Sequence, residues 1–429
     1  MLYSKLLIGI RFILRQYFKH IHIDGLDNLP VDKPIILACN HPSSFLEPIV
    51  LASVASRRFH FLVRGDIFKT KFVRWFLKHT HQVPIFRAKD GISKLRNNSD
   101  TFEFCYQAFR ENAAIIIFSE SVTQMVKRLR TLHRGTWRLA YNTVVHNPDM
   151  ELYIVPTGVN FSSPDRFRSE VMISFGKPID VRAYISSHPD TPRNTIIRGT
   201  EILATKMKEQ MVHFEDDDSE KLGDAFLTLI ENGLDKGGKK KLFGRQQLQL
   251  EQQFARLFSS LSPEKQQLYN SRVNNYWKSI KYNRETDQIL VGTRPNKWLI
   301  PKALLLLIPG ILGIIFNIIP FVLASILRSK IVRFKEFYAP IRIGLWFVFL
   351  FIQTVLIMVI GFQWVGYLVF FSLVTPLLIP VSIRLYETCL HIIGKIRYQG
   401  IKNKVASLLE EREALLQEIY VQGTDTTIS

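Results

Sequence analysis

The sequence contains little cysteine, with only Cys39, Cys105 and Cys389 in 429 residues. Three thiols this far apart do not form the even, closely spaced sets typical of a disulfide framework or a structural zinc site. The sequence therefore argues against the small disulfide-rich and zinc-binding classes, and a reducing compartment is expected.

Phosphate loops and metal-binding sets are also missing. The 22 glycines are scattered, and none clusters at the end of a predicted strand, which argues against a glycine-rich nucleotide loop. The histidine pairs His20/His22 and His79/His81 have no further ligand at metal-binding spacing. No small-residue cleavage site follows the apolar N-terminus. We therefore expect no cofactor, no bound metal and no cleavable signal peptide.

Acidic residues are the scarcer charged type, with 37 Asp and Glu against 56 Lys and Arg, so the formal net charge is +19. The composition is nevertheless apolar, with 47% hydrophobic residues and a mean hydropathy of +0.06. Because the apolar residues are concentrated in blocks, this combination favours an anionic membrane surface as the partner over nucleic acid.

Residues 1–20 alternate apolar and basic positions at helical spacing, which predicts an amphipathic helix lying in the membrane interface. A core helix of the globular domain is the alternative. Residues 21–213 are expected to form the globular domain, and residues 214–297 a charged helical linker. Within this linker, 215–241 is predicted to be exposed apart from a short helix, and 246–280 to form one or two solvated helices.

Short apolar runs alternate with helical stretches through the globular domain, which is typical of an α/β fold. The run from Pro34 to Cys39 is continuous enough to be a strand buried on both faces. The predicted strands are 34–39, 59–63, 82–86, 114–118, 152–156 and 170–175. The predicted helices are 45–55, 71–78, 91–111 and 136–146.

Residues 298–390 hold three apolar segments, at 303–327, 343–360 and 367–383. Prolines and glycines interrupt the first of them. Basic residues flank the first segment on both sides and follow the last, so the positive-inside rule favours a re-entrant first segment and a spanning pair, with both termini cytoplasmic. Three simple spans are the alternative. Residues 391–429 are expected to be a cytoplasmic helix and tail.

The run that ends at Cys39 leads directly into Asn40, His41 and Pro42, and Glu47 follows within two helical turns. An imidazole at the carboxyl end of a buried strand lies where open α/β sheets bind their ligands. A carboxylate that holds such a ring makes the unit of general-base catalysis. A surface-loop histidine with an unrelated glutamate is the alternative.

Three later strands also end in polar sequences: Val-Pro-Ile-Phe-Arg at 83–87, Phe-Ser-Glu-Ser at 118–121 and Val-Pro-Thr-Gly at 155–158. The guanidinium of Arg87 has the planar fork that clamps a phosphate. A basic cluster at 127–134 follows the second of these sequences. A plain surface arginine and a solvated helix face are the alternatives.

In their order and spacing, these four motifs resemble the glycerol-3-phosphate and lysophosphatidate acyltransferase family (PlsC-like), over residues 20–212. The resemblance implies an α/β domain whose mixed sheet is flanked by helices. The resemblance does not cover the C-terminal apolar segments, but together with them it implies a membrane-bound enzyme of phospholipid synthesis. Such an enzyme moves a fatty acyl group from acyl-CoA or acyl-carrier protein to a hydroxyl of glycerol-3-phosphate, lysophosphatidate or a related lysolipid.

By the same resemblance, His41 is the general base, and Glu47 orients its ring and stabilises the imidazolium. Arg87 is assigned to the phosphate of the acceptor and Glu120 to a glycerol hydroxyl. The expected substrate-binding residues are Asn40, Ser44, Arg87, Glu120, Ser121, Arg130 and Arg134.

The sequence departs from the family pattern at two places. Five residues, instead of the usual four, separate His41 from Glu47, which replaces the usual Asp. Ser119 and Ser121 stand where the family has Pro and Gly, and a serine at positive φ costs on the order of 1 kcal/mol. These departures motivate an alternative: a catalytically silent lipid-binding or scaffold protein that retains the acyltransferase fold.

Overall fold

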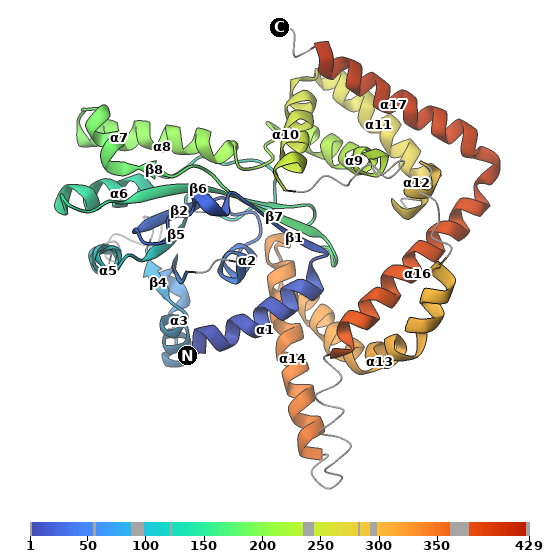
Figure 1. The fold of residues 1–429 in the computed structure, drawn as a ribbon, viewed down its shortest axis with the longest axis horizontal. Helices are drawn as coiled ribbons and strands as arrows, with labels where there is room; N and C mark the ends of the chain where they lie inside the picture. Colours follow the sequence, from blue (N-terminus) through green and yellow to red (C-terminus); the bar gives the residue numbers. More distant parts are fainter. Residues whose placement is uncertain are drawn as a thin grey trace. The chain divides into compact units, whose positions relative to one another are not determined.

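The computed structural model describes residues 2–54, 57–86, 98–120, 122–234, 244–281, 284–291, 298–360 and 377–425. The chain divides into two compact units (Figure 1). Unit 1 contains Met1–Met211 together with Phe334–Pro340, and unit 2 contains Val212–Arg333 and Ile341–Ser429.

Unit 1 is built on a mixed eight-stranded sheet in the order β1-β7-β6-β2-β5-β3-β4, with β8 paired to β6. The central strand β2 runs parallel to both β5 and β6, whereas β7 and β8 are antiparallel to β6. The predicted α/β class with a mixed sheet is thereby confirmed. The strands are β1 (His20–Asp24), β2 (Ile35–Cys39), β3 (Phe59–Arg64), β4 (Gln82–Ile85), β5 (Ala114–Phe118), β6 (Tyr153–Phe161), β7 (Glu170–Phe175) and β8 (Ile179–Asp180).

Helices cover both faces of this sheet, so every residue of β2 is buried, as its continuous apolar sequence predicts. Ile36 and Ala38 point into a core shared with α5, α6, α7 and α8, and α7 and α8 lie on the face away from α1 and α2 (Figure 1). The sequence patterns did not predict α7 or α8. The helices are α1 (Leu2–Tyr17), α2 (Leu46–Val54), α3 (Lys71–His79), α5 (Asn98–Arg110), α6 (Gly135–His146), α7 (Val181–Ser187) and α8 (Pro192–Lys208).

The N-terminal helix α1 is built into unit 1 at its carboxyl end. Leu14, Tyr17 and Phe18 are buried, and the Arg168 guanidinium donates to the carbonyl of Phe18 at 2.8 Å. The last turns of α1 therefore belong to the globular core, which is the alternative interpretation of this segment. Ile8, two turns earlier, is exposed, and an interfacial role for the first turns stays a prediction.

Unit 2 contains a packed set of helices where the sequence predicted a charged helical linker. Phe226, Phe258 and Tyr276, from three of these helices, are fully buried. The prediction for 215–241 was wrong up to residue 234, because an acidic start conceals an 18-residue amphipathic helix. The helices are α9 (Asp217–Leu234), α10 (Arg245–Ser260), α11 (Pro263–Ser279), α12 (Arg284–Leu290) and α17 (Val405–Asp425).

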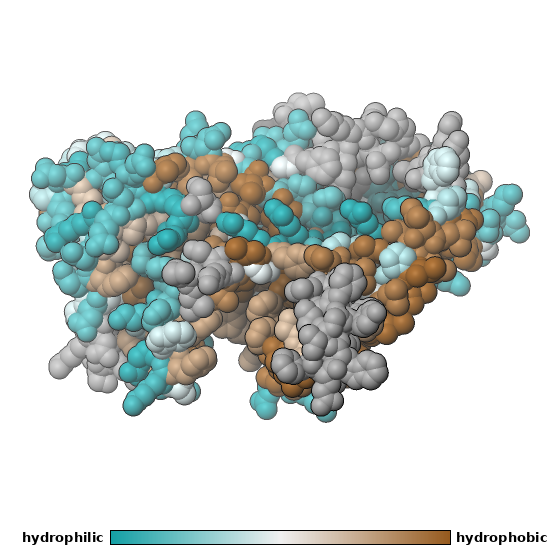
Figure 2. Space-filling model, turned by 60° about the horizontal axis from the view of Figure 1, so that its bottom comes forward, coloured by the Kyte–Doolittle hydropathy of each residue, from teal (hydrophilic) through white to brown (hydrophobic). Residues whose placement is uncertain are grey.

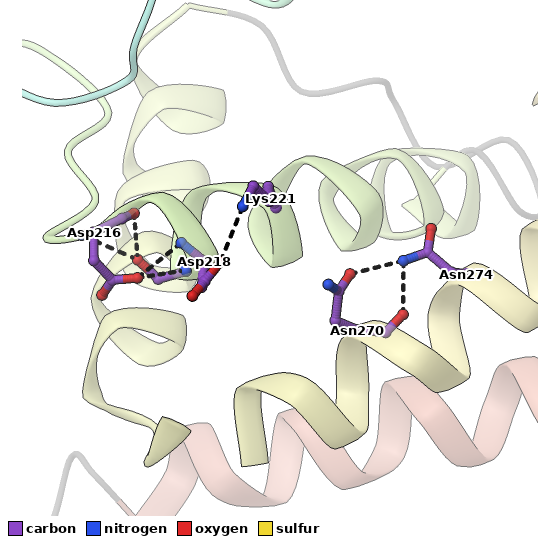
Figure 3. A network of polar contacts seen from close by, with 6 residues as sticks. Asp216, Asp218, Lys221, Asn270 and Asn274 are labelled. Atoms are coloured by element: carbon purple, nitrogen blue, oxygen red, sulfur yellow. Dashed lines mark hydrogen bonds and ion pairs between the residues drawn. The ribbon is translucent and has the colours of Figure 1, made fainter. Parts of the chain in front are cut away.

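The acidic run that suggested a linker is the amino-terminal cap of α9 (Figure 3). The Asp216 carboxylate accepts from the backbone N–H groups of Asp218 and Ser219 at 2.9 and 2.8 Å. Lys221 then pairs with Asp218 at 3.0 Å. Acidic side chains at the start of a helix accept hydrogen bonds from its free N–H groups and interact favourably with the positive end of the helix dipole. The acidic run therefore stabilises the start of α9.

A buried ionic network joins four helices of unit 2. Asp287 of α12 accepts from the Arg412 guanidinium of α17 at 2.9 Å, from the Asn232 amide at 2.6 Å and from the Tyr276 hydroxyl. Arg412 also donates to the carbonyl of Leu229 at 2.5 Å. Burial and the adjacent Asp287 charge raise the pKa of Tyr276 above its ordinary value, so its hydroxyl stays a donor.

Among the residues that the structure describes, two helices are long and apolar enough to cross a membrane, at Leu299–Ile331 and Lys335–Val359. They correspond to α13 (Leu299–Ile331) and α14 (Tyr338–Ile360), which expose much of the hydrophobic surface in Figure 2. The predicted first segment lies in one continuous helix, α13, which includes Pro309 and Pro320 and follows a bent path (Figure 1). Its re-entrant path in the membrane stays a prediction. Most of the predicted segment 367–383 lies outside the described residues.

A third helix, α16 (Ile379–Gly400), packs closely on α13. Ser382 donates to the carbonyl of Gly310 at 3.1 Å, and a Cβ added at Gly313 would lie only 2.2 Å from the Ser382 hydroxyl. The glycines that interrupt the apolar sequence therefore permit close helix packing, as small residues do between membrane helices.

Candidate active site

The ends of three parallel strands bring the predicted site residues together. Cys39, the last residue of β2, is in register with Phe118 on β5 and with Thr157 on β6. Because these strands run in the same direction, the segment after Cys39 lies beside the segment after Phe118. This juxtaposition at the carboxyl edge of the sheet is what the sequence motifs predicted.

Asn40 fastens the end of β2 to its neighbour. Its amide nitrogen donates to the carbonyl of Val159 at 3.1 Å, and its amide oxygen accepts from the Val159 N–H at 2.7 Å. Both polar atoms of the buried side chain are thus engaged with β6. Asn40 fixes the backbone from which His41 projects, and its direct role toward substrate stays a prediction.

His41 and Glu47 face each other as expected. The His41 Nδ1 atom lies 3.5 Å from the Glu47 Oε2 atom, and the Glu47 side chain is 0% exposed. The other carboxylate oxygen accepts from the backbone N–H of Ser43, whereas Nδ1 and Oε2 approach each other without forming a hydrogen bond. The His41 ring stacks on Phe118, with centroids 4.1 Å apart and planes 19° apart. The imidazole is therefore oriented by a buried charge and by a flat apolar wall.

The connecting turn explains how a glutamate with one additional intervening residue reaches the ring. Ser44 has a left-handed backbone with φ of 51°, at a cost of about 1–2 kcal/mol. Glu47 lies in the first turn of α2, and its side chain folds back toward Ser43. Ser44 is buried in this turn, so the described geometry gives it a conformational role.

Glu120 is the second buried carboxylate of the site, at 4% exposure. Burial, with a smaller contribution from the nearby charge of Glu47, raises the pKa of Glu120 to about 7. The Arg130 charge and the backbone N–H groups of His41 and Arg130 act in the opposite direction. Glu120 is therefore close to half-ionised at neutral pH and is linked electrostatically to the His41 turn.

The remaining predicted site residues differ in where they lie, and two of them are outside the described residues. Arg130 and Arg134 are exposed, and Arg134 immediately precedes α6. Ser119 bonds to the Thr136 hydroxyl at 2.9 Å, which anchors the turn before Glu120. Arg87 and Ser121 lie outside the described residues. Among the residues that the structure describes, no group of three or more His, Cys, Asp or Glu side chains is arranged to hold a metal.

One part of the site was not predicted: the turn Lys335–Phe337 between α13 and α14, which belongs to unit 1. The Glu336 carbonyl accepts from the Ser43 hydroxyl at 3.4 Å, and its carboxylate accepts from the Met125 N–H at 3.5 Å. The Phe337 ring meets the Phe45 ring edge-on at 5.9 Å. The turn therefore contacts the His41–Glu47 turn and the segment after Glu120. Nothing in the local sequence marks it, because it reads as a short basic loop between apolar segments.

The buried charge of Glu120 gives a pH-dependent stability. Between the ordinary glutamate pKa of about 4.3 and the folded value of about 7, the folded protein holds this proton and the unfolded chain does not. Raising the pH through this window therefore destabilises the wild type. Glu120→Gln cannot ionise, so its melting temperature relative to the wild type is expected to rise with pH, as followed by scanning fluorimetry in detergent.

Glu111→Gln, at an exposed position after α5, controls for the loss of a surface carboxylate. A difference between Glu120→Gln and the wild type that stays constant from pH 4.3 to 7 would contradict the assignment.

The fold and site define a class of protein: an α/β domain with a carboxylate-oriented histidine at the carboxyl ends of parallel strands. Residues 20–160 match the family model named Acyltransferase. This part of the chain thus carries an acyltransferase domain, in agreement with the resemblance to PlsC-like glycerolipid acyltransferases that the four motifs predicted.

Three curated relatives show the extent of the likeness. The chain is 29% identical over 146 residues to the chloroplastic 1-acyl-sn-glycerol-3-phosphate acyltransferase LPAT1 of Arabidopsis thaliana, covering 33% of this chain and 39% of that protein. It is 27% identical over 93 residues to 1-acyl-sn-glycerol-3-phosphate acyltransferase of Bacillus subtilis, covering 21% and 43%. It is 27% identical over 101 residues to glycerol-3-phosphate O-acyltransferase 2 of Saccharomyces cerevisiae, covering 23% and 14%.

The chain thus spans less than half the length of each of these relatives. Among solved structures, PlsC from Thermotoga maritima aligns with 47% of this chain and 80% of its own, at 17% identity and a TM-score of 0.33.

Proposed function

We propose that the protein is a membrane-bound O-acyltransferase of phospholipid synthesis. It moves a fatty acyl group from acyl-CoA or acyl-carrier protein to a hydroxyl of glycerol-3-phosphate, lysophosphatidate or a related lysolipid. The observation that carries this proposal is the His41–Glu47 pair, with Nδ1 and Oε2 3.5 Å apart beside a second buried carboxylate. The names of the relatives point to the same chemistry.

The reaction needs a base for the acceptor and no covalent enzyme intermediate, because a thioester is already activated. With Nδ1 turned to Glu47, the Nε2 atom of His41 takes the proton of the acceptor hydroxyl. The hydroxyl oxygen then forms a bond to the thioester carbonyl carbon. When the tetrahedral intermediate collapses, the carbon–sulfur bond breaks, and the thiolate leaves with the proton returned by His41. Glu47 stabilises the imidazolium between these two steps.

The acceptor site is proposed to use the charges next to this pair. Glu120, when ionised, accepts a hydrogen bond from a hydroxyl of the acceptor, and Arg130 and Arg134 supply exposed positive charge for its phosphate. Arg87 is proposed to take part in the same phosphate contact. Acyl-CoA and acyl-carrier protein are both anionic donors, so the same basic surface suits either of them.

Membrane attachment is proposed through α13 and α14, whose apolar lengths suffice to cross a bilayer. Basic residues lie in the last turn of α13, at Arg328 and Lys330, and between α13 and α14, at Arg333 and Lys335. By the positive-inside rule this cluster lies on the cytoplasmic side, which would expose unit 1 to cytoplasmic thioesters.

An assay with labelled acyl-CoA and a panel of acceptors tests the function. We expect acylation of glycerol-3-phosphate or of at least one lysophospholipid by the full chain in detergent or vesicles. The second candidate, a silent lipid-binding scaffold, rests on Ser119 and Ser121 in place of the usual Pro and Gly. Binding of lysolipids without turnover on any acceptor or donor would favour this scaffold.

The unpredicted turn gives a further test of the site. Glu336→Ala removes the acceptor for the Met125 N–H, and we expect kcat to fall about tenfold, because small displacements of reacting groups are costly. Glu336→Gln retains an acceptor oxygen and should keep most of the activity. Lys335→Ala, at the exposed neighbouring position, is the matched control in steady-state kinetics. Equal activity of all three variants would exclude a positioning role for Glu336.

A further inference from the structure

Helix α3 carries an exposed aromatic pair outside the site. The Phe72 and Trp75 side chains lie one helical turn apart and are 71% and 49% exposed. Their rings stack, with centroids 6.1 Å apart and planes 28° apart. Most exposed large apolar residues of unit 1 occur singly, whereas this pair forms one continuous apolar ridge.

The opposite side of α3 is packed against unit 1. Leu77 is buried, and Val73 and Phe76 are partly buried. The helix is capped by Thr70, whose hydroxyl accepts from the Val73 N–H at 3.2 Å. The aromatic ridge is therefore presented outward by an anchored helix.

Positive charge surrounds the ridge. The Lys and Arg side chains of residues 67–80 are all exposed: Lys69, Lys71, Arg74 and Lys78. No acidic residue occurs in the sequence from position 67 to 89. Arg74 and Lys78 lie on either side of Trp75 in the sequence. The same helix therefore carries aromatic side chains that can insert into an apolar phase and cations that attract anions.

We propose that α3 docks on an anionic lipid bilayer, with Phe72 and Trp75 inserted at the headgroup level and the four cations on lipid phosphates. An amphipathic helix with aromatic residues on one side and basic residues beside them has the composition that binds membrane interfaces. Charge complementarity identifies the occupant, since anionic headgroups attract the cations. The docking concerns unit 1 alone and does not require acyl transfer.

The test places an environment-sensitive fluorophore on the ridge of the full chain in lipid vesicles. Of the three cysteines, Cys39 and Cys105 are buried and Cys389 is exposed, so Phe72→Cys is labelled in a Cys389→Ser background. Val145→Cys on α6, also exposed, carries the matched control label. Lipids with brominated acyl chains quench a fluorophore that enters the interface.

We expect quenching at position 72 to exceed that at position 145 several-fold in vesicles containing phosphatidylglycerol. It should decrease in phosphatidylcholine alone and at high salt, because the attraction to anionic lipid is screened. Replacing Lys71 and Lys78 with Glu should weaken insertion by about fivefold or more for each cation lost. Equal quenching at both positions, or quenching at position 72 that is independent of anionic lipid, would overturn the proposal. If α3 instead binds a protein partner, the fluorophore at position 72 would not enter the bilayer, and the two positions would be quenched equally.

Discussion

His41→Ala is expected to lower kcat about a hundred- to ten-thousand-fold, with little change in KM for either substrate. This is the range that a positioned general base contributes. The alanine removes the imidazole that faces the buried Glu47 carboxylate, so the acceptor hydroxyl loses its proposed base. Steady-state rates with labelled acyl-CoA and the best acceptor of the panel measure the loss.

His146→Ala, at an exposed histidine near the end of α6, is the matched control and should retain normal activity. A melting temperature close to that of the wild type would show that His41→Ala remains folded. Normal turnover by a folded His41→Ala protein would remove His41 from the mechanism.

The second large effect is expected on stability, in unit 2. Arg412→Ala leaves Asp287 buried without its cation, and breaking a buried ion pair from one side costs about 3–5 kcal/mol. Asn232 and the Tyr276 hydroxyl remain as donors to Asp287, but neither neutralises the carboxylate. Denaturant unfolding of the full chain in detergent, followed by tryptophan fluorescence, measures the change in free energy.

An exposed ion pair in the same unit provides the comparison. Arg272 and Glu418 also join α11 to α17, with side chains 34% and 42% exposed. Arg272→Ala should therefore cost about 0–1 kcal/mol, since water solvates the partner that is left behind. If the two arginine variants lost equal stability, burial would not be the cause. Asp287→Asn combined with Arg412→Met tests whether removing both charges restores stability.

The sequence predicted the sheet well where burial leaves a simple pattern. The run from Ile35 to Cys39 is apolar at every position because β2 is covered on both faces, and β5 follows the same logic. Once these strands are parallel, His41 and Glu120 have to lie at the same edge. The position of the His41–Glu47 turn could therefore be predicted from local patterns together with one topological rule.

The errors have physical causes too. The sequence did not predict the full length of α9, because its first turn carries three acidic residues. Runs of charge usually indicate solvated segments. Asn40 had to be seen in space, since its partner Val159 is 119 positions later. The left-handed conformation of Ser44 is also invisible in a sequence that offers no glycine there.

The Glu336 turn has a consequence for how this chain is divided. The family match ends at residue 160, but one wall of the His41 turn is encoded about 290 residues after it. A fragment cut after the sheet would keep His41, Glu47 and Glu120 and would lose this wall. A domain swap that exchanges residues 20–212 alone would therefore transplant the site residues without the Glu336 turn that contacts them.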